Sequence, residues 1–135
     1  MKIARILCPT DFSEGSAHAI DLAVAIARWY KARIAAIHVI DAGVAVPEMG
    51  ISGSHNPADP RAIRAMMASS FSSAANADRD VDLFVEAGPP AKCILESAAT
   101  LPADLIVIGT HGAAGFQHLM LGSVTERVLR KAPCP

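Results

Sequence analysis

Residues 104–109 have the sequence DLIVIG, in which four consecutive apolar residues stand between an aspartate and a glycine. A run this short and continuous is typical of a strand buried on both faces, as the strands of parallel sheets are. Apolar runs of similar length occur at residues 3–8, 33–40 and 82–87, and stretches with helical periodicity separate them. Strands that alternate with helices predict a doubly wound α/β fold, a parallel sheet with helices on both faces.

Four amphipathic helices are predicted, over residues 13–31, over residues 59 to about 78, from residue 89 onward, and over residues 122–131. Ser13 and Asp59 are good N-caps, and Pro60 and Pro90 suit a first helical turn. The apolar residues of each predicted helix recur at helical spacing and so form one stripe, which we expect to face the sheet. These inward positions are Ile20, Ala23, Val24, Ala27, Tyr30, Ile63, Met66, Met67, Phe71, Ala74, Ala91, Ile94, Leu95, Ala98, Val124, Val128 and Leu129.

Length and composition predict a single domain over residues 1–135, 52% hydrophobic and 19% charged. A formal net charge of −1 argues against a nucleic-acid partner. The longest apolar run, residues 22–27, is too short to span a bilayer, and no signal peptide precedes it, so we expect a cytoplasmic protein with no membrane partner. The three cysteines and five histidines have no metal-binding spacing.

The glycine-rich segment after residues 104–109 is the strongest candidate for chemistry. Residues 109–115 read GTHGAAG, and residues 122–125 read GSVT at the start of the last helix. Glycine allows a ligand to approach the backbone closely, and a helix start offers unpaired N–H groups with a partial positive charge. Together they make a cradle for an anion such as phosphate. Alternatively, the glycines only shape a turn and Ser123 only caps a helix.

This chain resembles the universal stress protein family. The resemblance lies in the pattern Gly109-x2-Gly112-x9-Gly122-Ser123, in residues 6–13 (ILCPTDFS) and in residues 104–109. It implies a five-stranded parallel sheet of order 3-2-1-4-5. It also implies membership of the ATP-binding branch, with adenine and ribose near Asp11 and Val39 and the phosphates on the loop from residue 109 to residue 123. The candidate binding residues are Pro9, Thr10, Asp11, Val39, Gly109, Thr110, His111, Gly112, Gly115, Gly122, Ser123, Val124 and Thr125.

Several of these residues carry groups that suit nucleotide binding. The Asp11 carboxylate can accept hydrogen bonds from ribose hydroxyls or an adenine amine, although it could equally be a helix-start carboxylate. Ser123 and Thr125 offer hydroxyls to a phosphate oxygen, and Ser123 could contact Mg²⁺. Val39 is otherwise a core strand residue, and His111 an exposed loop residue.

The chain departs from the resemblance at its end, where residues 132–135 read APCP instead of a fifth apolar strand. In the family that strand commonly pairs across a homodimer interface. Its absence would leave the strand at residues 104–109 as an exposed apolar edge. Either a tail follows residue 135, which we favour, or a neighbouring chain covers that edge.

Three functions remain open. The first is a regulatory protein that binds ATP, ADP or AMP without fast turnover and has no catalytic residue. Residues 109–125 contain no lysine or arginine to neutralise a γ-phosphate. The second is a slow ATPase or adenylyl-transferring enzyme, and the third a dimeric scaffold that binds no nucleotide. Residues 41–59, which follow the second strand, could cover the nucleotide as a lid.

Overall fold

The computed structural model describes residues 1–41, 59–74, 81–110 and 122–135. Within these ranges the elements are β1 (Arg5–Pro9), α1 (Glu14–Tyr30), β2 (Arg33–Ile40), α2 (Pro60–Ala74), β3 (Val81–Ala87), α3 (Pro90–Thr100), β4 (Leu105–Ile106) and α4 (Ser123–Lys131). The strands form a sheet in the order β3-β2-β1-β4, and every pairing is parallel. The predicted α/β fold and the order of its first four strands are confirmed.

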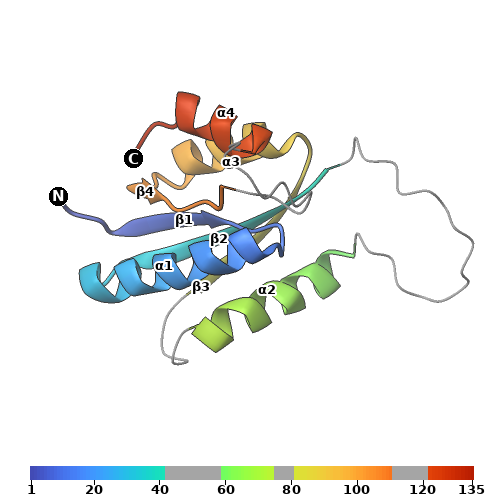
Figure 1. Cartoon of the computed structure of the whole chain (residues 1–135), viewed down its shortest axis with the longest axis horizontal. Helices are drawn as coiled ribbons and strands as arrows, with labels where there is room; N and C mark the ends of the chain where they lie inside the picture. The colour runs from blue at the N-terminus through green and yellow to red at the C-terminus, as the bar shows by residue number, and fades with distance from the viewer. Residues whose placement is uncertain (42–58, 75–80, 111–121) are drawn as a thin grey trace, which may run out of the picture.

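The helices cover both faces of the sheet. Helices α1 and α2 lie on one side of it and α3 and α4 on the other (Figure 1). Alternate residues of β1 divide between the two faces, since Ile6 and Cys8 pack toward α1 and α2 while Leu7 packs toward α3 and α4. We refer to these as the α1–α2 face and the α3–α4 face. Both faces of the central strands are therefore core, which explains their continuous apolar sequences.

The starts of α1 and α2 follow the predicted capping chemistry. Ser13 is the N-cap of α1, and its hydroxyl oxygen accepts a hydrogen bond from the N–H of Ser16 at 3.2 Å. The Asp59 carboxylate accepts one from the N–H of Arg61 at 2.9 Å at the start of α2. Each side chain satisfies a backbone donor that has no partner inside its own helix.

Three residues predicted to face inward are exposed instead. Tyr30 is 44% exposed because it is the last residue of α1, directly before the left-handed Lys31 that turns the chain toward β2. Met66 is 51% exposed because, over residues 60–72, α2 buries every fourth residue, namely Ile63, Met67 and Phe71. Leu129 is 62% exposed because it lies beside the stripe of α4 that is centred on the buried Val128. The predictions for these three residues were wrong.

The fourth strand is shorter than predicted. Residues 104–109 were expected to form a strand buried on both faces, but β4 covers only Leu105–Ile106, and both of these residues are half-buried. The N–H of Val107 still donates to the carbonyl of Leu7 in β1 at 2.9 Å, but residues 107–109 are not part of the strand. On the other edge of β4 the N–H of Ile106 donates to the carbonyl of Pro135 at 2.8 Å. The end of the described chain therefore contacts the edge where the fifth strand was expected, and no fifth strand occurs in the described ranges.

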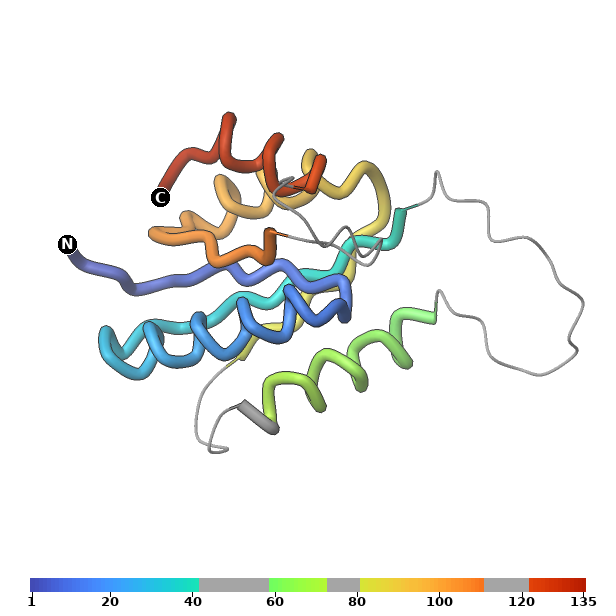
Figure 2. Tube along the Cα trace, in the orientation of Figure 1, coloured from blue at the N-terminus to red at the C-terminus, as the bar shows by residue number. Residues whose placement is uncertain are grey.

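The two termini lie at the same end of the sheet (Figure 2). The parallel strands run from that end and finish at the opposite end. In the part of the chain that the structure describes, no helix is long and apolar enough to cross a bilayer. No group of three or more His, Cys, Asp or Glu side chains within these residues could hold a metal ion.

Candidate functional site

The candidate site lies at the carboxyl ends of β1 and β4. The strand order reverses between these two neighbours, because β1 leads into α1 on one face and β4 leads toward α4 on the other. The connections after β1 and β4 therefore lead to opposite faces, and open α/β sheets bind ligands at such a switch point, to which we refer as the crevice. Pro9, Thr10 and Asp11 approach this crevice from β1, and Gly109 and Thr110 approach it from β4.

The carboxylate of Asp11 is held at the start of α1. Its Oδ1 accepts hydrogen bonds from the hydroxyl of Ser16 at 2.6 Å and from the N–H of Ser13 at 3.0 Å. The hydroxyl of the buried Ser16 also accepts a hydrogen bond from the N–H of Asp11 at 3.0 Å. Asp11 itself is exposed to solvent. The contacts expected of a helix-start carboxylate are thus present, and they fix the orientation of this exposed carboxylate; its role toward a ligand stays a prediction.

Thr10 is buried beneath this turn. Its N–H donates to the carbonyl of Ile37 at 2.9 Å, which continues the pairing of β1 with β2 for one residue beyond the strand. Its hydroxyl oxygen accepts a hydrogen bond from the N–H of Phe12 at 3.3 Å. Thr10 therefore anchors the turn to the sheet with its backbone and closes the turn with its side chain.

Two residues that shape the turn were missed by the sequence analysis. Phe12 has a φ of 63°, a left-handed conformation that few non-glycine residues adopt. Its ring packs against the ring of His38 with the centroids 4.8 Å apart, and His38 Nδ1 lies 2.8 Å from the carbonyl oxygen of Thr10. The local sequence gave no signal for either contact, because His38 reaches the turn only through the pairing of β2 with β1.

Gly109 must be a glycine because α1 packs directly against it. A Cβ atom at this position would lie 2.8 Å from the carbonyl carbon and oxygen of Gly15 and 3.1 Å from the nitrogen of Ser16. The missing side chain therefore lets the segment that follows β4 touch the first turn of α1. This contact brings the two halves of the crevice together.

The loop that follows β4 is fastened at both ends. The buried hydroxyl of Thr125 donates to the carbonyl of Gly109 at 2.6 Å, and the N–H of Gly122 donates to the carbonyl of Thr110 at 2.8 Å. These two bonds place the start of α4 beside the end of β4. Because the Thr125 hydroxyl uses its only proton on Gly109, it serves to position α4 in this structure.

Helix α4 begins without a side-chain cap from the residues that the structure describes. Its N-cap is Gly122, not Ser123, so the alternative that Ser123 caps the helix is wrong. The N-cap has no side chain to accept a hydrogen bond, and the first helical bond runs from the N–H of Glu126 to the carbonyl of Gly122 at 2.9 Å. The N–H groups of residues 123–125 precede this bond and have no partner within the helix by its geometry. Ser123 is exposed beside them.

The other candidate residues divide into two groups. Val39, at the end of β2, and Val124, in the first turn of α4, are both half-buried against the α3–α4 face, together with Ile108. The structure thus brings Val39 to the same face as the start of α4. His111, Gly112 and Gly115 lie outside the described residues, as does nearly all of the segment at residues 41–59 that was considered as a lid.

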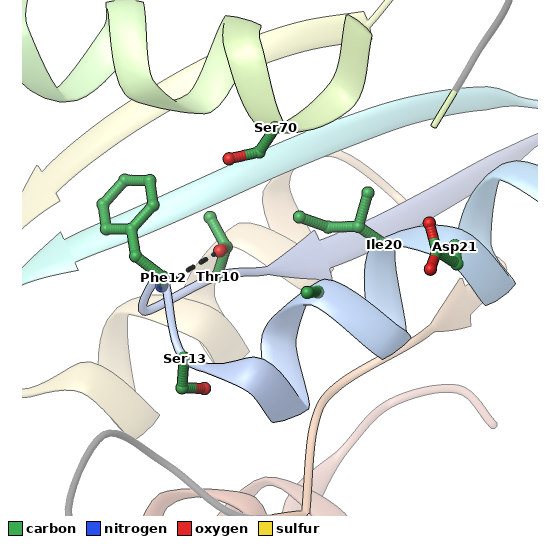
Figure 3. A pocket seen from close by; sticks show the side chains of 7 residues that line it. Thr10, Phe12, Ser13, Ile20, Asp21 and Ser70 are labelled. Atoms are coloured by element: carbon green, nitrogen blue, oxygen red, sulfur yellow. Dashed lines mark hydrogen bonds between the residues drawn. The ribbon is translucent and has the colours of Figure 1, made fainter. Parts of the chain in front are cut away.

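A separate pocket of about 320 Å³ opens between α1 and α2 (Figure 3). It is lined by Thr10, Phe12, Ser13, Ala17, Ile20, Asp21 and Ser70. Ile20 and Phe12 belong to the core of the α1–α2 face, so this pocket lies on the other side of the sheet from Val39 and Val124. Of the ten predicted site residues that the structure describes, only Thr10 contributes to it.

Comparison with known proteins identifies the family. A sequence model described as the universal stress protein family matches residues 2–135. Universal stress protein MJ0531 from Methanocaldococcus jannaschii is 36% identical over 141 residues, covering 97% of this chain and 78% of that protein. The chain belongs to the universal stress protein family.

Solved structures of universal stress proteins share this fold. UspA from Lactobacillus plantarum matches with a TM-score of 0.77 and 28% identity, over 99% of this chain and 95% of that one. A universal stress protein crystallised in complex with cAMP matches with a TM-score of 0.70 and 24% identity, over 99% and 94% of the two chains. The fold and the family are thereby established for this universal stress protein.

Proposed function

We propose that this universal stress protein binds an adenine nucleotide across the crevice between β1 and β4. The observation that carries the proposal is the start of α4, which has glycine at its N-cap, no side-chain cap among the described residues, and a position beside Gly109 and the first turn of α1. Unpaired N–H groups at a helix start favour a phosphate group. The start of α1 is closed by its own Ser13 side chain, so α4 is the better anion site of the two.

The two ends of the nucleotide would meet different residues. The exposed Asp11 would accept hydrogen bonds from the ribose or adenine, and the half-buried Val39 would contact the adenine ring from the α3–α4 face. The phosphates would lie on Thr110, on His111, Gly112 and Gly115 of the connecting loop, and on the start of α4. The exposed Ser123 hydroxyl suits a Mg²⁺ ion carried by the phosphates. The neighbour in complex with cAMP is a family member that holds an adenine nucleotide, which agrees with the proposal, although at 24% identity the assignment rests on this chain's residues.

The proposed activity is binding that regulates, not fast hydrolysis. Rapid phosphoryl transfer needs charge neutralisation at the γ-phosphate and a group that positions water. Residues 109–125 supply neither lysine nor arginine, and Arg127 lies exposed in the second turn of α4. Nucleotide occupancy would instead alter a dimer or partner surface. We also propose that the protein acts in the cytoplasm as a homodimer formed at the outer edge of β4, beside the contact between Ile106 and Pro135, which sedimentation at several concentrations would test.

The decisive experiment is titration of ATP with Mg²⁺ into the wild-type protein and the Gly122→Val variant. Gly122 has a φ of −58°, which valine tolerates, so the fold should survive with a modest loss from the poorer N-cap. The added side chain would stand in the path of the phosphates, and we expect ATP affinity to fall about tenfold or more, the value of one charge-assisted hydrogen bond.

Ala99→Val is the matched control, because it adds the same side chain at an exposed position of α3. Normal ATP binding by Gly122→Val, or equal losses in both variants, would contradict the proposed site. Phosphate release that scales with protein concentration and disappears in Gly122→Val would favour the slow ATPase. Failure of the wild type to bind ATP at millimolar concentration would favour the scaffold.

A further inference from the structure

His38 holds both ends of the turn that presents Asp11. The N–H of Thr10 donates to the carbonyl of Ile37, and the neighbouring residue, His38, bonds the Thr10 carbonyl through Nδ1 at 2.8 Å. A carbonyl oxygen can only accept, so Nδ1 must carry a proton. The peptide groups on both sides of Thr10 are thus tied to consecutive residues of β2.

The same imidazole ring supports the residue that follows Asp11. Phe12 adopts its left-handed conformation with its ring tilted against that of His38, at a centroid distance of 4.8 Å and an interplanar angle of 37°. Such a backbone conformation costs free energy in a non-glycine residue and persists only where its surroundings enforce it. Figure 3 shows Phe12 and Thr10 on the α1–α2 side of this turn, joined by the hydrogen bond from the Phe12 N–H to the Thr10 hydroxyl.

We infer that His38 is a positioning residue for the adenosine end of the nucleotide site. It lies beneath the turn, it contacts Thr10 before Asp11 and Phe12 after it, and its own backbone leads directly into Val39. His38 therefore sets where the Asp11 carboxylate stands relative to Val39 without touching the ligand. This inference rests on the proposed nucleotide site and adds to it a residue from the opposite face of the sheet.

Two substitutions separate the two contacts of His38. His38→Phe keeps a ring for Phe12 and removes the donor to Thr10, whereas His38→Asn keeps a donor at the position of Nδ1 and removes the ring. We expect His38→Phe to weaken binding of AMP and of ATP by the same factor, about tenfold, because a lost hydrogen bond leaves the buried Thr10 carbonyl without a partner. His38→Asn should recover most of this loss.

Comparing the loss of AMP affinity with the loss of ATP affinity shows whether a substitution acts at the adenosine end or at the phosphate end of the nucleotide. Gly122→Val should weaken ATP more than AMP, and His38→Phe should weaken both equally. The matched control is His18→Phe, a histidine exposed on the outer side of α1. Wild-type affinity in His38→Phe, or a loss that His38→Asn does not recover, would overturn the inference.

Hydrogen exchange provides a readout that needs no ligand. The amides of Phe12 and Ser13 should exchange at least about tenfold faster in His38→Phe than in the wild type or in His18→Phe, since opening of this turn is no longer opposed by the hydrogen bond. If the wild type binds no nucleotide, the proposed function fails and the exchange rates alone decide the role of His38.

If His38→Phe does not fold, the ring-nitrogen spectrum of wild-type His38 is decisive. A proton on Nδ1 supports the inference, and a ring protonated only on Nε2 overturns it.

Discussion

Replacing Gly109 by alanine should destabilise the protein by pushing apart the two halves of the crevice. The new Cβ would lie 2.8 Å from the carbonyl carbon and oxygen of Gly15, whereas ordinary contacts of a Cβ begin at 3.4 Å, so the backbones must separate by about 0.6 Å. The atoms that clash belong to the backbone and cannot rotate away. Overpacking of this kind costs about 1–3 kcal/mol, which for a domain of this length lowers Tm by roughly 3–9 °C.

Thermal and urea unfolding of Gly109→Ala measure this cost. Gly122→Ala is the matched control, because its φ of −58° suits any residue and its Tm should fall only by the modest cost of a poorer N-cap. ATP affinity should fall in Gly109→Ala as well, since displacing the first turn of α1 moves the Ser16 hydroxyl that holds Asp11. A Tm for Gly109→Ala within about 1 °C of the wild type would refute the close contact between β4 and α1.

The remaining predictions concern stability and thiol chemistry. Thr125→Val should lower the free energy of unfolding by about 1–2 kcal/mol, because Gly109 loses the hydroxyl that bonds its carbonyl; urea denaturation measures this, and an unchanged midpoint would contradict it. Cys8 should resist thiol reagents in the native protein while the two half-buried cysteines react, since burial raises the pKa of Cys8 to about 12; three fast-reacting thiols would show that Cys8 is accessible. Asp104→Asn should destabilise the protein at neutral pH and lose this effect in acid. Two backbone N–H groups near the start of β1 hold the pKa of the Asp104 carboxyl below its ordinary 3.8, so the ionised form stabilises the fold above that pH and protonation removes the benefit as the pH falls through the lowered pKa; a pH-independent effect would contradict this.

The sequence was sufficient for features that depend on neighbouring residues. The apolar runs predicted the strands, and Ser13 and Asp59 predicted the starts of α1 and α2, because capping involves residues only a few positions apart. The alternation of strands and helices then led to a parallel sheet covered on both faces. The strand order came from the family resemblance, and the position of the crevice stays a prediction from that order.

Features that depend on the register between distant segments could not be predicted. Gly109 was interpreted as a residue that lets phosphate approach, and the structure shows that it also admits the backbone of α1, which lies far away in sequence. The contact between His38 and the Thr10 carbonyl requires the alignment of β2 with β1. The local sequence does not predict the left-handed conformation of Phe12. The short β4 depends on the available pairing partners, since a continuous apolar run does not fix where a ladder ends.

Exposed positions on the helices were the other source of error. Helical periodicity gives the direction of the buried stripe but not its width, which depends on how the helix lies against the sheet. Met66 and Leu129 lie beside narrow stripes, and Tyr30 lies at the end of a helix. Their burial could be decided only once the neighbouring elements were in place.

A ¹⁵N–¹H NMR titration of the wild-type protein with ATP and Mg²⁺ tests the central claim most directly, because it reports on each backbone amide. We predict that the amide signals of Ser123, Val124 and Thr125 shift most strongly, together with that of Asp11. In Gly122→Val the α4 amide signals should not shift. Unmoved α4 amides at saturating ATP, or shifts centred on the pocket between α1 and α2, would contradict it.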